Sequence, residues 1–266
     1  AVTLEDVQNA AIKYFRGDKA RIVITGKGID VLKNLEKGDY KISYFDKYGN
    51  PTTKPTMTLP IPEGVTAATV IDKYFDAIGG KSKAKAVKTT IMVANATIQG
   101  TPLVMTKKAS FPNKTSQSIA VMGNVMQKTI FNGTNGYTVA RGQKIDMKLE
   151  EVEEAKKGNT IFSDLDYASG KLVRIEPLDG KNAIVLEYNN TEIFYDMASG
   201  LKVKEVKTVK IPNGKETKVP TVFSDYKEVN GIKFPHSIGL KSGPMDLNFV
   251  VKEIKINEGV SEADFQ

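Results

Sequence analysis

"NGIKFPHSIGL", residues 230–240, alternates between apolar and polar or small side chains over most of its length. Successive side chains of a β-strand point to opposite sides, so every second residue shares a face. The row on one face consists of Ile232, Phe234, His236, Ile238 and Leu240. The segment therefore predicts a half-buried strand. His236 is the only histidine of the chain and lies in the apolar row, where it could be a catalyst, a metal ligand or a core residue with a polar edge.

Extended segments of the same kind recur through the second part of the chain, joined by short turns such as "DMASG" and "EVNG". Short turns favour antiparallel neighbours, so this spacing predicts a meander of about eleven strands. The predicted strands are residues 85–97, 101–111, 115–122, 125–131, 171–178, 182–188, 191–197, 201–211, 217–228, 231–241 and 246–256. Amphipathic helices at 66–80 and 146–158 and a helical turn at 163–170 complete the pattern. The predicted fold class is α+β, mainly β, with a strongly curved antiparallel sheet that wraps its helices.

Lysines alternate with apolar residues in several predicted strands, as in "LKVKEVKTVKI", residues 201–211. We interpret these lysines as the solvated face of the sheet, where they also discourage edge-to-edge pairing. The net charge of +7 does not by itself indicate a nucleic-acid partner, because arginines are few and tryptophan is absent. We therefore expect no nucleic acid among the partners.

The first 58 residues form a small separate unit, in which predicted helices alternate with predicted strands. Apolar residues at helical spacing begin at Leu4, and Thr3 and Asp6 are placed as a capping box, so a helix is predicted there. The elements predicted after it are a buried strand at 20–26, a helix at 29–37 and a strand at 39–46. So small an α+β unit cannot build a robust core alone. We interpret it as the tail of a larger domain.

Two prolines, Pro60 and Pro62, mark residues 59–65 as a linker, so the predicted domains are 1–58 and 66–266. The chain opens with an amphipathic helix rather than a signal peptide, and its first residue is not Met. We expect a chain that is either processed or cut from a longer protein. No apolar run approaches the roughly 18 residues of a spanning helix, so a transmembrane protein is not expected.

The sequence contains no recognisable catalytic constellation. A zinc-peptidase motif needs two histidines one helical turn apart, and His236 stands alone. There is no Gly-x-Ser-x-Gly elbow for a catalytic triad, and the absence of cysteine excludes disulfides and thiolate metal sites. The acidic run at 150–154 is followed by lysines, which favours a solvated helix face over a cation site. We predict no enzyme activity and no cofactor for this chain, and a packed strand histidine at 236.

Methionines gather in the first predicted strands of the sheet, beside large apolar residues. Met is unbranched and polarisable, and it suits surfaces that bind flexible apolar ligands, although ordinary core filling is the simpler explanation. A curved sheet with more apolar residues than its helices can cover would leave a cavity for a lipid-like ligand. The candidate cavity residues are Met92, Met105, Met122, Met126, Phe131, Phe234, His236 and Ile238.

Three segments of the second unit resemble the periplasmic lipoprotein-carrier superfamily of the LolA/LolB and outer-membrane lipoprotein-sorting type. They are "PNKTSQSIAVMGNVMQKTIFNGTNGYTVARGQ" (112–143), "YDMASGLKVKEV" (195–206) and "VFSDYKEVNGIKFPHSI" (222–238). The resemblance implies an incomplete antiparallel barrel, closed by two or three helices over an apolar cavity. It also implies a periplasmic or outer-membrane-associated protein of the Gram-negative envelope. Its partner would be a lipid, an acyl chain, or a hydrophobic or lipidated peptide.

The first unit is similar to the closing helix–strand–helix–strand of a pitrilysin/insulinase-family peptidase domain, over "LEDVQNAAIKYFRGDKARIVITGKGIDVLKNLEKGDYKISYFDKYGNP" (4–51). The resemblance implies a zinc metallopeptidase as the parent protein, with zinc only in a part that this chain lacks and with the rest of the parent as a partner. We predict that the chain is the non-catalytic C-terminal region of such an envelope peptidase, with a carrier-like domain that binds an apolar ligand. The alternative is a purely structural or dimerisation module without a ligand cavity.

Overall fold

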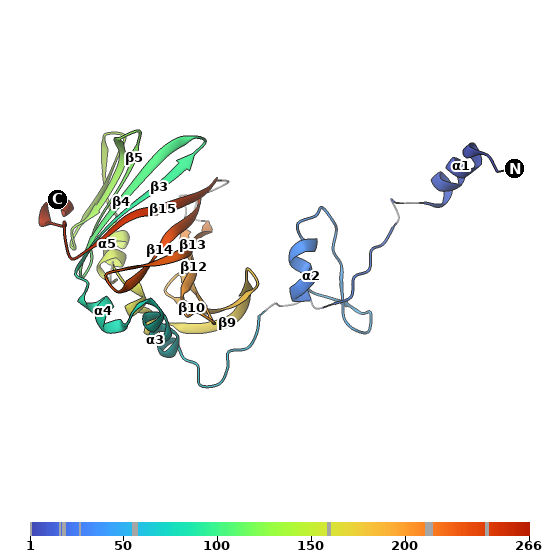
Figure 1. Ribbon diagram of the computed structural model, residues 1–266, viewed down its shortest axis with the longest axis horizontal. Helices are drawn as coiled ribbons and strands as arrows, with labels where there is room; N and C mark the ends of the chain where they lie inside the picture. Colours follow the sequence, from blue (N-terminus) through green and yellow to red (C-terminus); the bar gives the residue numbers. More distant parts are fainter. Residues whose placement is uncertain are drawn as a thin grey trace. The chain divides into compact units, whose positions relative to one another are not determined.

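The structure is a computed structural model that describes residues 2–15, 17, 20–26, 28–54, 58–158, 161–210, 215–242 and 245–266. The chain divides into two units, Ala1–Met57 and Thr58–Gln266, and each is described by itself. The larger unit, called the body below, is built on one 13-stranded sheet (Figure 1).

The sheet of the body consists of two antiparallel meanders. The first comprises β3 (Thr89–Ile98), β4 (Thr101–Ser110), β5 (Lys114–Val121), β6 (Asn124–Phe131), β7 (Gly136–Ala140) and β8 (Gln143–Asp146). The second comprises β9 (Lys171–Leu178), β10 (Lys181–Tyr188), β11 (Thr191–Asp196), β12 (Lys202–Lys210), β13 (Glu216–Val229), β14 (Ile232–Ser242) and β15 (Met245–Ile256). β15 pairs with β3, so the first and last strands meet in the middle. β8 and β9 end the strand order and are not paired with each other, so the sheet of the described strands is bent but open (Figure 1).

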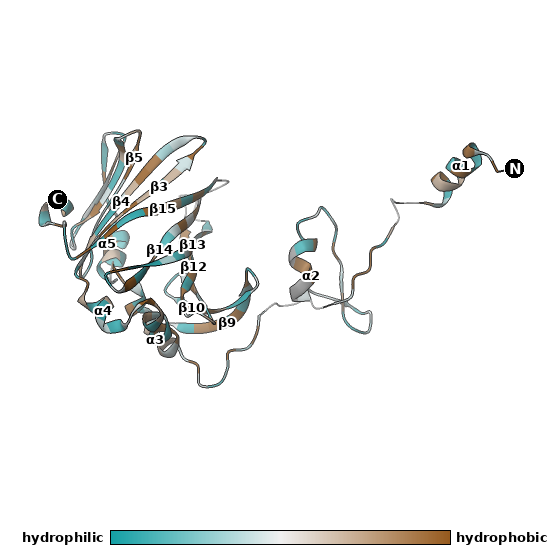
Figure 2. Cartoon of the chain, viewed as in Figure 1, coloured by the Kyte–Doolittle hydropathy of each residue, from teal (hydrophilic) through white to brown (hydrophobic). Residues whose placement is uncertain are grey.

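The mainly β, antiparallel architecture is confirmed, but the sheet has 13 strands rather than about eleven. The two missed strands are β7 and β8. All four residues of β8 are exposed, and β7 is only five residues long, so neither shows the alternation that marks a half-buried strand. Alternation is visible along the longer strands in Figure 2. Ile211, the last residue of the strand predicted at 201–211, lies outside the described residues.

The helix predicted at 66–80 is present as α3 (Ala67–Ile78), and it covers one side of the sheet, called the inner face below. Thr66 and Thr69 form a capping box at its start. It ends at Gly79, where φ is 122° and an added Cβ would lie 2.2 Å from the Gly231 carbonyl oxygen, so the position requires glycine. The buried face of the helix consists of Ala67, Val70, Ile71, Tyr74, Phe75 and Ile78. Each large side chain of this face contributes about 1.5–3 kcal/mol by burial, so α3 fixes the main core.

The connection from β8 to β9 runs over the inner face and contains α5 (Leu149–Lys156), η2 (Ser163–Leu165) and η3 (Tyr167–Ser169). These elements confirm the helix predicted at 146–158 and the helical turn predicted at 163–170. The Asn113 side-chain amide donates to the Lys156 carbonyl at 3.3 Å, and Lys207 pairs with Glu154 at 2.7 Å. One contact comes from each meander, so α5 joins the two halves of the sheet.

Two further short helices flank the sheet. α4 (Lys81–Ala86) follows α3 directly and replaces the start of the strand predicted at 85–97. η4 (Glu262–Phe265) packs beside β5, where Phe265 is buried. Lys108 pairs with Asp264, and Lys114 pairs with Glu262 at 2.5 Å. These ion pairs hold the C-terminal turn against the sheet.

Residues 232–240 of the alternating segment lie in β14, and Ile232 and Phe234 are buried as predicted. Pro235 has no N–H to donate, yet it lies inside this strand. The register of β15 reaches β14 only from Ser237 to Ser242, so Pro235 interrupts no bonds on that side.

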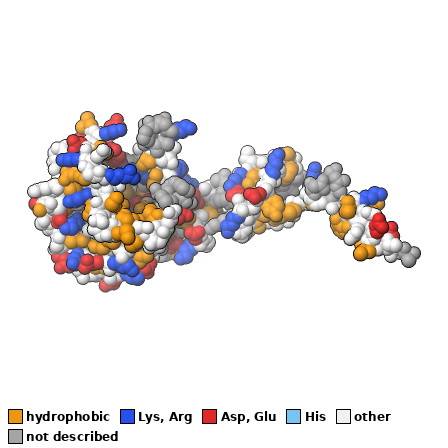
Figure 3. Space-filling model, turned by 90° about the horizontal axis from the view of Figure 1, so that it is seen from above, with side chains coloured by type: hydrophobic (Ala, Val, Ile, Leu, Met, Phe, Trp, Pro, Cys, Tyr) orange, Lys and Arg blue, Asp and Glu red, His pale blue; other side chains and the backbone are white. Residues whose placement is uncertain are grey.

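The smaller unit has little regular structure and almost no core. It contains α1 (Leu4–Tyr14), α2 (Gly28–Leu35), β1 (Tyr44–Phe45) and β2 (Pro51–Thr52). The capping box of Thr3 and Asp6 is confirmed. Among the described residues of this unit, Leu32 is the one buried hydrophobic side chain, and apolar side chains lie open on its surface (Figure 3).

The buried strand predicted at 20–26 is wrong. These residues form no strand, and the side chains of Ile22 and Val23 are 74% and 84% exposed. The strand predicted at 39–46 is reduced to Tyr44–Phe45. An apolar run becomes a buried strand only where another layer covers it, and the described part of this unit supplies none.

The linker predicted at 59–65 begins with a residue that is bonded to the sheet. Leu59 and Ile175 of β9 exchange two backbone hydrogen bonds, at 2.7 and 3.1 Å. The body therefore includes this residue and uses it to cover part of its β9 edge.

Candidate ligand-binding site

The inner face carries two apolar clusters. The first, the α3 cluster, includes the buried face of α3 together with Phe162, Leu186, Ile193 and Phe234. The second, the β3–β4–β15 cluster, has Ala94, Ala96, Leu103, Met105, Phe249 and Val251 at its centre. Around that centre, side chains such as Met92, Ile119 and Ile238 are only partly buried. The α3 cluster is likewise surrounded by partly buried hydrophobic side chains, so apolar residues of the inner face are incompletely covered at both clusters.

The eight candidate cavity residues lie in different environments. Met92, Met105 and Ile238 meet in the β3–β4–β15 cluster, whereas Phe234 belongs to the α3 cluster. Phe131 is buried in β6. Met122 and Met126 do not point into the interior, because their side chains are 78% and 46% exposed.

His236 is half-buried, and its Nδ1 lies 2.9 Å from the carbonyl oxygen of Phe234. Its neighbours in the row, Phe234 and Ile238, belong to the two different clusters. The imidazole thus has a local partner in its own strand.

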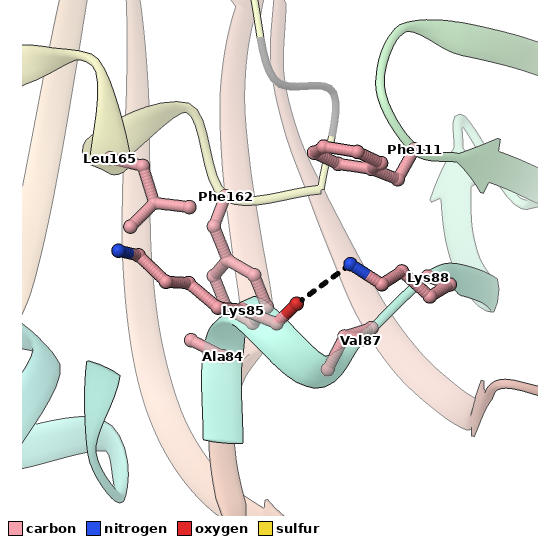
Figure 4. A pocket seen from close by; sticks show the side chains of 7 residues that line it. All are labelled: Ala84, Lys85, Val87, Lys88, Phe111, Phe162 and Leu165. Atoms are coloured by element: carbon pink, nitrogen blue, oxygen red, sulfur yellow. Dashed lines mark hydrogen bonds between the residues drawn. The ribbon is translucent and has the colours of Figure 1, made fainter. Parts of the chain in front are cut away.

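A hollow of about 230 Å³ opens beside the α3 cluster. Its lining residues come from α4, from the turns at the start of β3 and the end of β4, and from η2, and they are Ala84, Lys85, Val87, Lys88, Phe111, Phe162 and Leu165. In Figure 4, Phe111 lies next to Lys88 and Leu165 lies next to the end of the Lys85 side chain, with Phe162 between these two pairs. None of the eight residues chosen from the sequence lines it.

The walls of this hollow combine apolar side chains with two ammonium groups. Lys88 Nζ donates to the Lys85 carbonyl oxygen at 3.1 Å and lies 4.5 Å from the centre of the Phe111 ring. Phe162 is almost fully buried, whereas the Phe111 ring is 48% exposed and faces solvent on one side. The sequence signal for this site is the run "KSKAKAVK" (81–88), with four lysines in eight residues.

A buried charge cluster occupies another part of the inner face. Lys202 Nζ lies 2.8 Å from Asp164 Oδ2 and 2.9 Å from Glu205 Oε1. The Tyr195 hydroxyl donates to Asp164 Oδ1 at 2.6 Å, and the Tyr226 hydroxyl donates to the Lys202 carbonyl at 2.8 Å. Every buried side-chain nitrogen or oxygen of the described residues has a hydrogen-bond partner. The cluster is therefore internally satisfied.

The ionisation of this cluster follows from its burial. Burial alone would lower the pKa of the Lys202 ammonium, but the carboxylates of Asp164 and Glu205 outweigh it and hold the pKa well above its usual value. Burial also raises the pKa of Tyr195, and the Asp164 carboxylate raises it further. Burial lowers the pKa of Lys107, which lies on the same face, although Glu205 opposes the shift. Lys202 therefore remains charged inside the body.

The prediction that the lysines of residues 201–211 lie on the solvated face of the sheet is wrong for Lys202, which is buried on the inner face. In β12, Lys202 pairs with Tyr195 and Lys204 pairs with Phe194, so Val203 is an extra residue in a β-bulge. Tyr195 and Phe194 point to opposite faces, and the bulge therefore directs Lys202 inward and Lys204 outward. Lys204 lies over the Phe194 ring, 4.9 Å from its centre.

The parts of the chain that the structure describes contain no group of His, Cys, Asp and Glu side chains able to hold a metal ion. They also contain no helix that is both long and apolar enough to cross a membrane.

No protein-family model matches the chain, and no curated protein matches it. Several solved structures resemble the body. A LolA superfamily protein from Nitrosomonas europaea is 15% identical, with 76% of this chain and 98% of that chain covered and a TM-score of 0.48. A DUF1329 family protein from Desulfovibrio piger is 11% identical, with 76% and 98% covered and a TM-score of 0.46. A candidate outer membrane lipoprotein-sorting protein domain from Vibrio parahaemolyticus is 11% identical, with 73% and 97% covered and a TM-score of 0.43.

These likenesses extend over the greater part of the chain, but they leave its family open. None of the three structures is described as a peptidase. The resemblance of residues 4–51 to a pitrilysin/insulinase-family domain therefore stays a prediction.

Proposed function

We propose that the body binds an apolar ligand, such as a lipid, an acyl chain or a hydrophobic peptide, and that the ligand enters the hollow beside α4. The observation that carries the proposal is the composition of this hollow. Ala84, Val87 and Phe162 belong to the α3 cluster, and Leu165 packs against it. A ligand there would extend an existing apolar core rather than rest on an isolated surface.

The size of the hollow suits one end of a ligand. Its volume of about 230 Å³ is below the range of roughly 300–1,000 Å³ that is typical of complete small-molecule sites. Burial of four methylene groups would contribute about 3 kcal/mol, at about 0.8 kcal/mol each. That energy corresponds to an affinity gain of roughly a hundredfold, so even a partly inserted chain would be retained.

The finer parts of this proposal rest on the sequence. We propose that the chain is the non-catalytic part of an envelope zinc metallopeptidase, and that it works in the periplasm or at the outer membrane. The support is the resemblance of residues 4–51 and of the body segments, together with the single histidine of the chain. The zinc would lie in the part of the parent that this chain lacks.

Binding can be tested with an uncharged fluorescent probe, N-phenyl-1-naphthylamine, titrated into the full chain. We expect saturable fluorescence enhancement, competed by dodecan-1-ol. Phe111→Ala removes a half-exposed wall of the hollow and should weaken binding three- to tenfold. Met122→Ala, in a turn outside the interior, is the matched control and should leave binding unchanged.

The alternative, a structural or dimerisation module, makes the opposite prediction. In that case the probe would show no saturable binding, and Phe111→Ala would have no effect. Weakening by Met92→Ala, in the β3–β4–β15 cluster, without an effect of Phe111→Ala would instead favour the cavity predicted from the methionines.

A further inference from the structure

We propose that the ligand of this hollow is a single-chain amphiphile with an anionic head group, and that Lys85 and Lys88 bind that head. The inference rests on the proposed function, because it names the class of ligand for the same site. It starts from the charges that line the hollow. Among the described residues that line it, two are lysines and none is acidic.

Several other lysines of the body have carboxylate partners, although some, such as Lys83 and Lys204, have none among the described residues. Lys81, in the same basic run, pairs with Asp72 at 2.6 Å, and Lys114 pairs with Glu262 at 2.5 Å. The buried Lys202 has two such partners. Among the described residues, by contrast, no carboxylate lies within ion-pair distance of Lys85 or Lys88. The two lysines of the hollow therefore keep their positive charge uncompensated.

The hydrogen-bonding capacity of these lysines is also largely unused. An ammonium group has three N–H donors, and Lys88 uses one of them for the Lys85 carbonyl oxygen. No side-chain bond of Lys85 is seen among the described residues. A carboxylate or phosphate head group offers several acceptor oxygens, and charge-assisted bonds to it are about twice as strong as neutral ones. The lysines therefore suit an anion better than a hydroxyl or an ester.

The apolar side of the hollow selects the rest of the ligand. Phe111, Phe162 and Leu165 form apolar walls beside the lysines (Figure 4), and the Phe111 ring centre lies 4.5 Å from Lys88 Nζ. A free inorganic anion would leave these walls without contact, and a neutral lipid would offer the two ammonium groups no anionic partner. A molecule with an anionic head and one alkyl chain satisfies both sides of the hollow at once.

The experiment uses isothermal titration calorimetry on the full chain with four probes, dodecanoate, dodecyl phosphate, dodecan-1-ol and inorganic phosphate. We expect the two anionic amphiphiles to bind at least ten times more tightly than the alcohol, and inorganic phosphate not to bind. The double variant Lys85→Gln with Lys88→Gln should reduce the affinity for dodecanoate to that for dodecan-1-ol. Its affinity for the alcohol should be unchanged, which also shows that it is folded.

The matched control removes two charges from the same basic run outside the hollow, by Lys81→Gln with Lys83→Gln. It should change the affinity for dodecanoate less than twofold. An equal loss in the control would mean that the net charge of the protein attracts the anion, and it would overturn the inference. Tight binding of inorganic phosphate would overturn it as well.

The outcomes separate this inference from the proposed function. Equal affinity for dodecanoate and dodecan-1-ol, with no effect of the double variant, would overturn the anionic head group and leave apolar binding intact. Failure of dodecanoate and of the alcohol to bind at all would overturn the proposed function itself.

Discussion

Two of the places in the body where a lysine ammonium group lies against an aromatic ring differ in what neutralises the charge. Lys202 Nζ lies 5.2 Å from the centre of the Phe223 ring and forms ion pairs with Asp164 and Glu205. Lys88 Nζ lies 4.5 Å from the centre of the Phe111 ring, and the described residues that line its hollow include no carboxylate. Carboxylates of the protein neutralise the charge of Lys202, whereas none of the described residues neutralises the charge of Lys88. We infer that the first serves the fold, whereas the second is open to an external anion.

The difference in burial supports this division. The side chains of Lys202 and Asp164 are 11% and 2% exposed. Such a pair has lost most of its hydration, and it persists only because every polar atom has a partner. The pair also joins η2, in the connection between the two edges of the sheet, to β12. Its loss should therefore affect the fold of the whole body.

The largest expected effect is that of Asp164→Ala. This change leaves Lys202 with one carboxylate and removes the acceptor of the Tyr195 hydroxyl. Breaking one side of a buried ion pair costs about 3–5 kcal/mol, and we expect that loss in the free energy of unfolding measured with urea. The control is Glu262→Ala, which breaks the exposed pair with Lys114 and should cost about 0–1 kcal/mol.

A second variant sharpens this test. Asp164→Leu combined with Lys202→Met removes both charges and should recover much of the stability, because apolar replacements of buried ion pairs are often neutral. If Asp164→Ala proved no more destabilising than Glu262→Ala, the buried cluster would have no structural role.

The sequence predicted the parts of the body where local pattern and burial agree. The alternation of residues 230–240 and the helical spacing of 66–80 both correspond to elements that bury one face. The failures lie where burial depends on another part of the chain. Residues 20–26 have the composition of a buried strand, but nothing in the described part of their unit covers them. β8 is a strand through pairing with β7 alone, and all of its residues are exposed.

The sequence pattern could not predict the two lysine sites either, but for a different reason. The hollow brings together α4, Phe111 and η2, which are separated by more than twenty residues at each step, and none of these segments is distinctive by itself. The inward direction of Lys202 depends on the bulge at Val203, which inverts the face predicted from alternation. A register shift of one residue is a property of the paired strands, so a single strand does not reveal it.

Alkaline pH should change the free energy of unfolding by less than Asp164→Ala does and by more than substitutions in the hollow do. Burial, reinforced by the Glu205 carboxylate, raises the pKa of Tyr167 to about 12 from an ordinary value of 10.0. A tyrosine whose pKa is higher in the folded state stabilises the fold fully below pH 10 and loses that contribution as the pH rises toward 12. We therefore expect the free energy of unfolding to fall between about pH 10 and 12, and Tyr167→Phe should make that fall shallower. Phe111→Ala, in the hollow, should leave the slope unchanged, and an unchanged slope in Tyr167→Phe would contradict the burial of its hydroxyl.

The smallest effect on stability is expected at the hollow itself. Both lysines are exposed, and surface substitutions away from special features usually change stability by less than about 0.5 kcal/mol. Lys85→Gln should therefore be nearly neutral in urea unfolding, and Lys88→Gln should lose at most about 0.5–1 kcal/mol, the value of an exposed contact with an aromatic ring. The same changes should be the most damaging ones for binding of dodecanoate. A loss of several kcal/mol on Lys85→Gln would show that its charge is already used inside the fold, and the contrast with Lys202 would disappear. Near neutrality in stability combined with a large loss of anion binding is the pattern that separates a ligand site from a structural one.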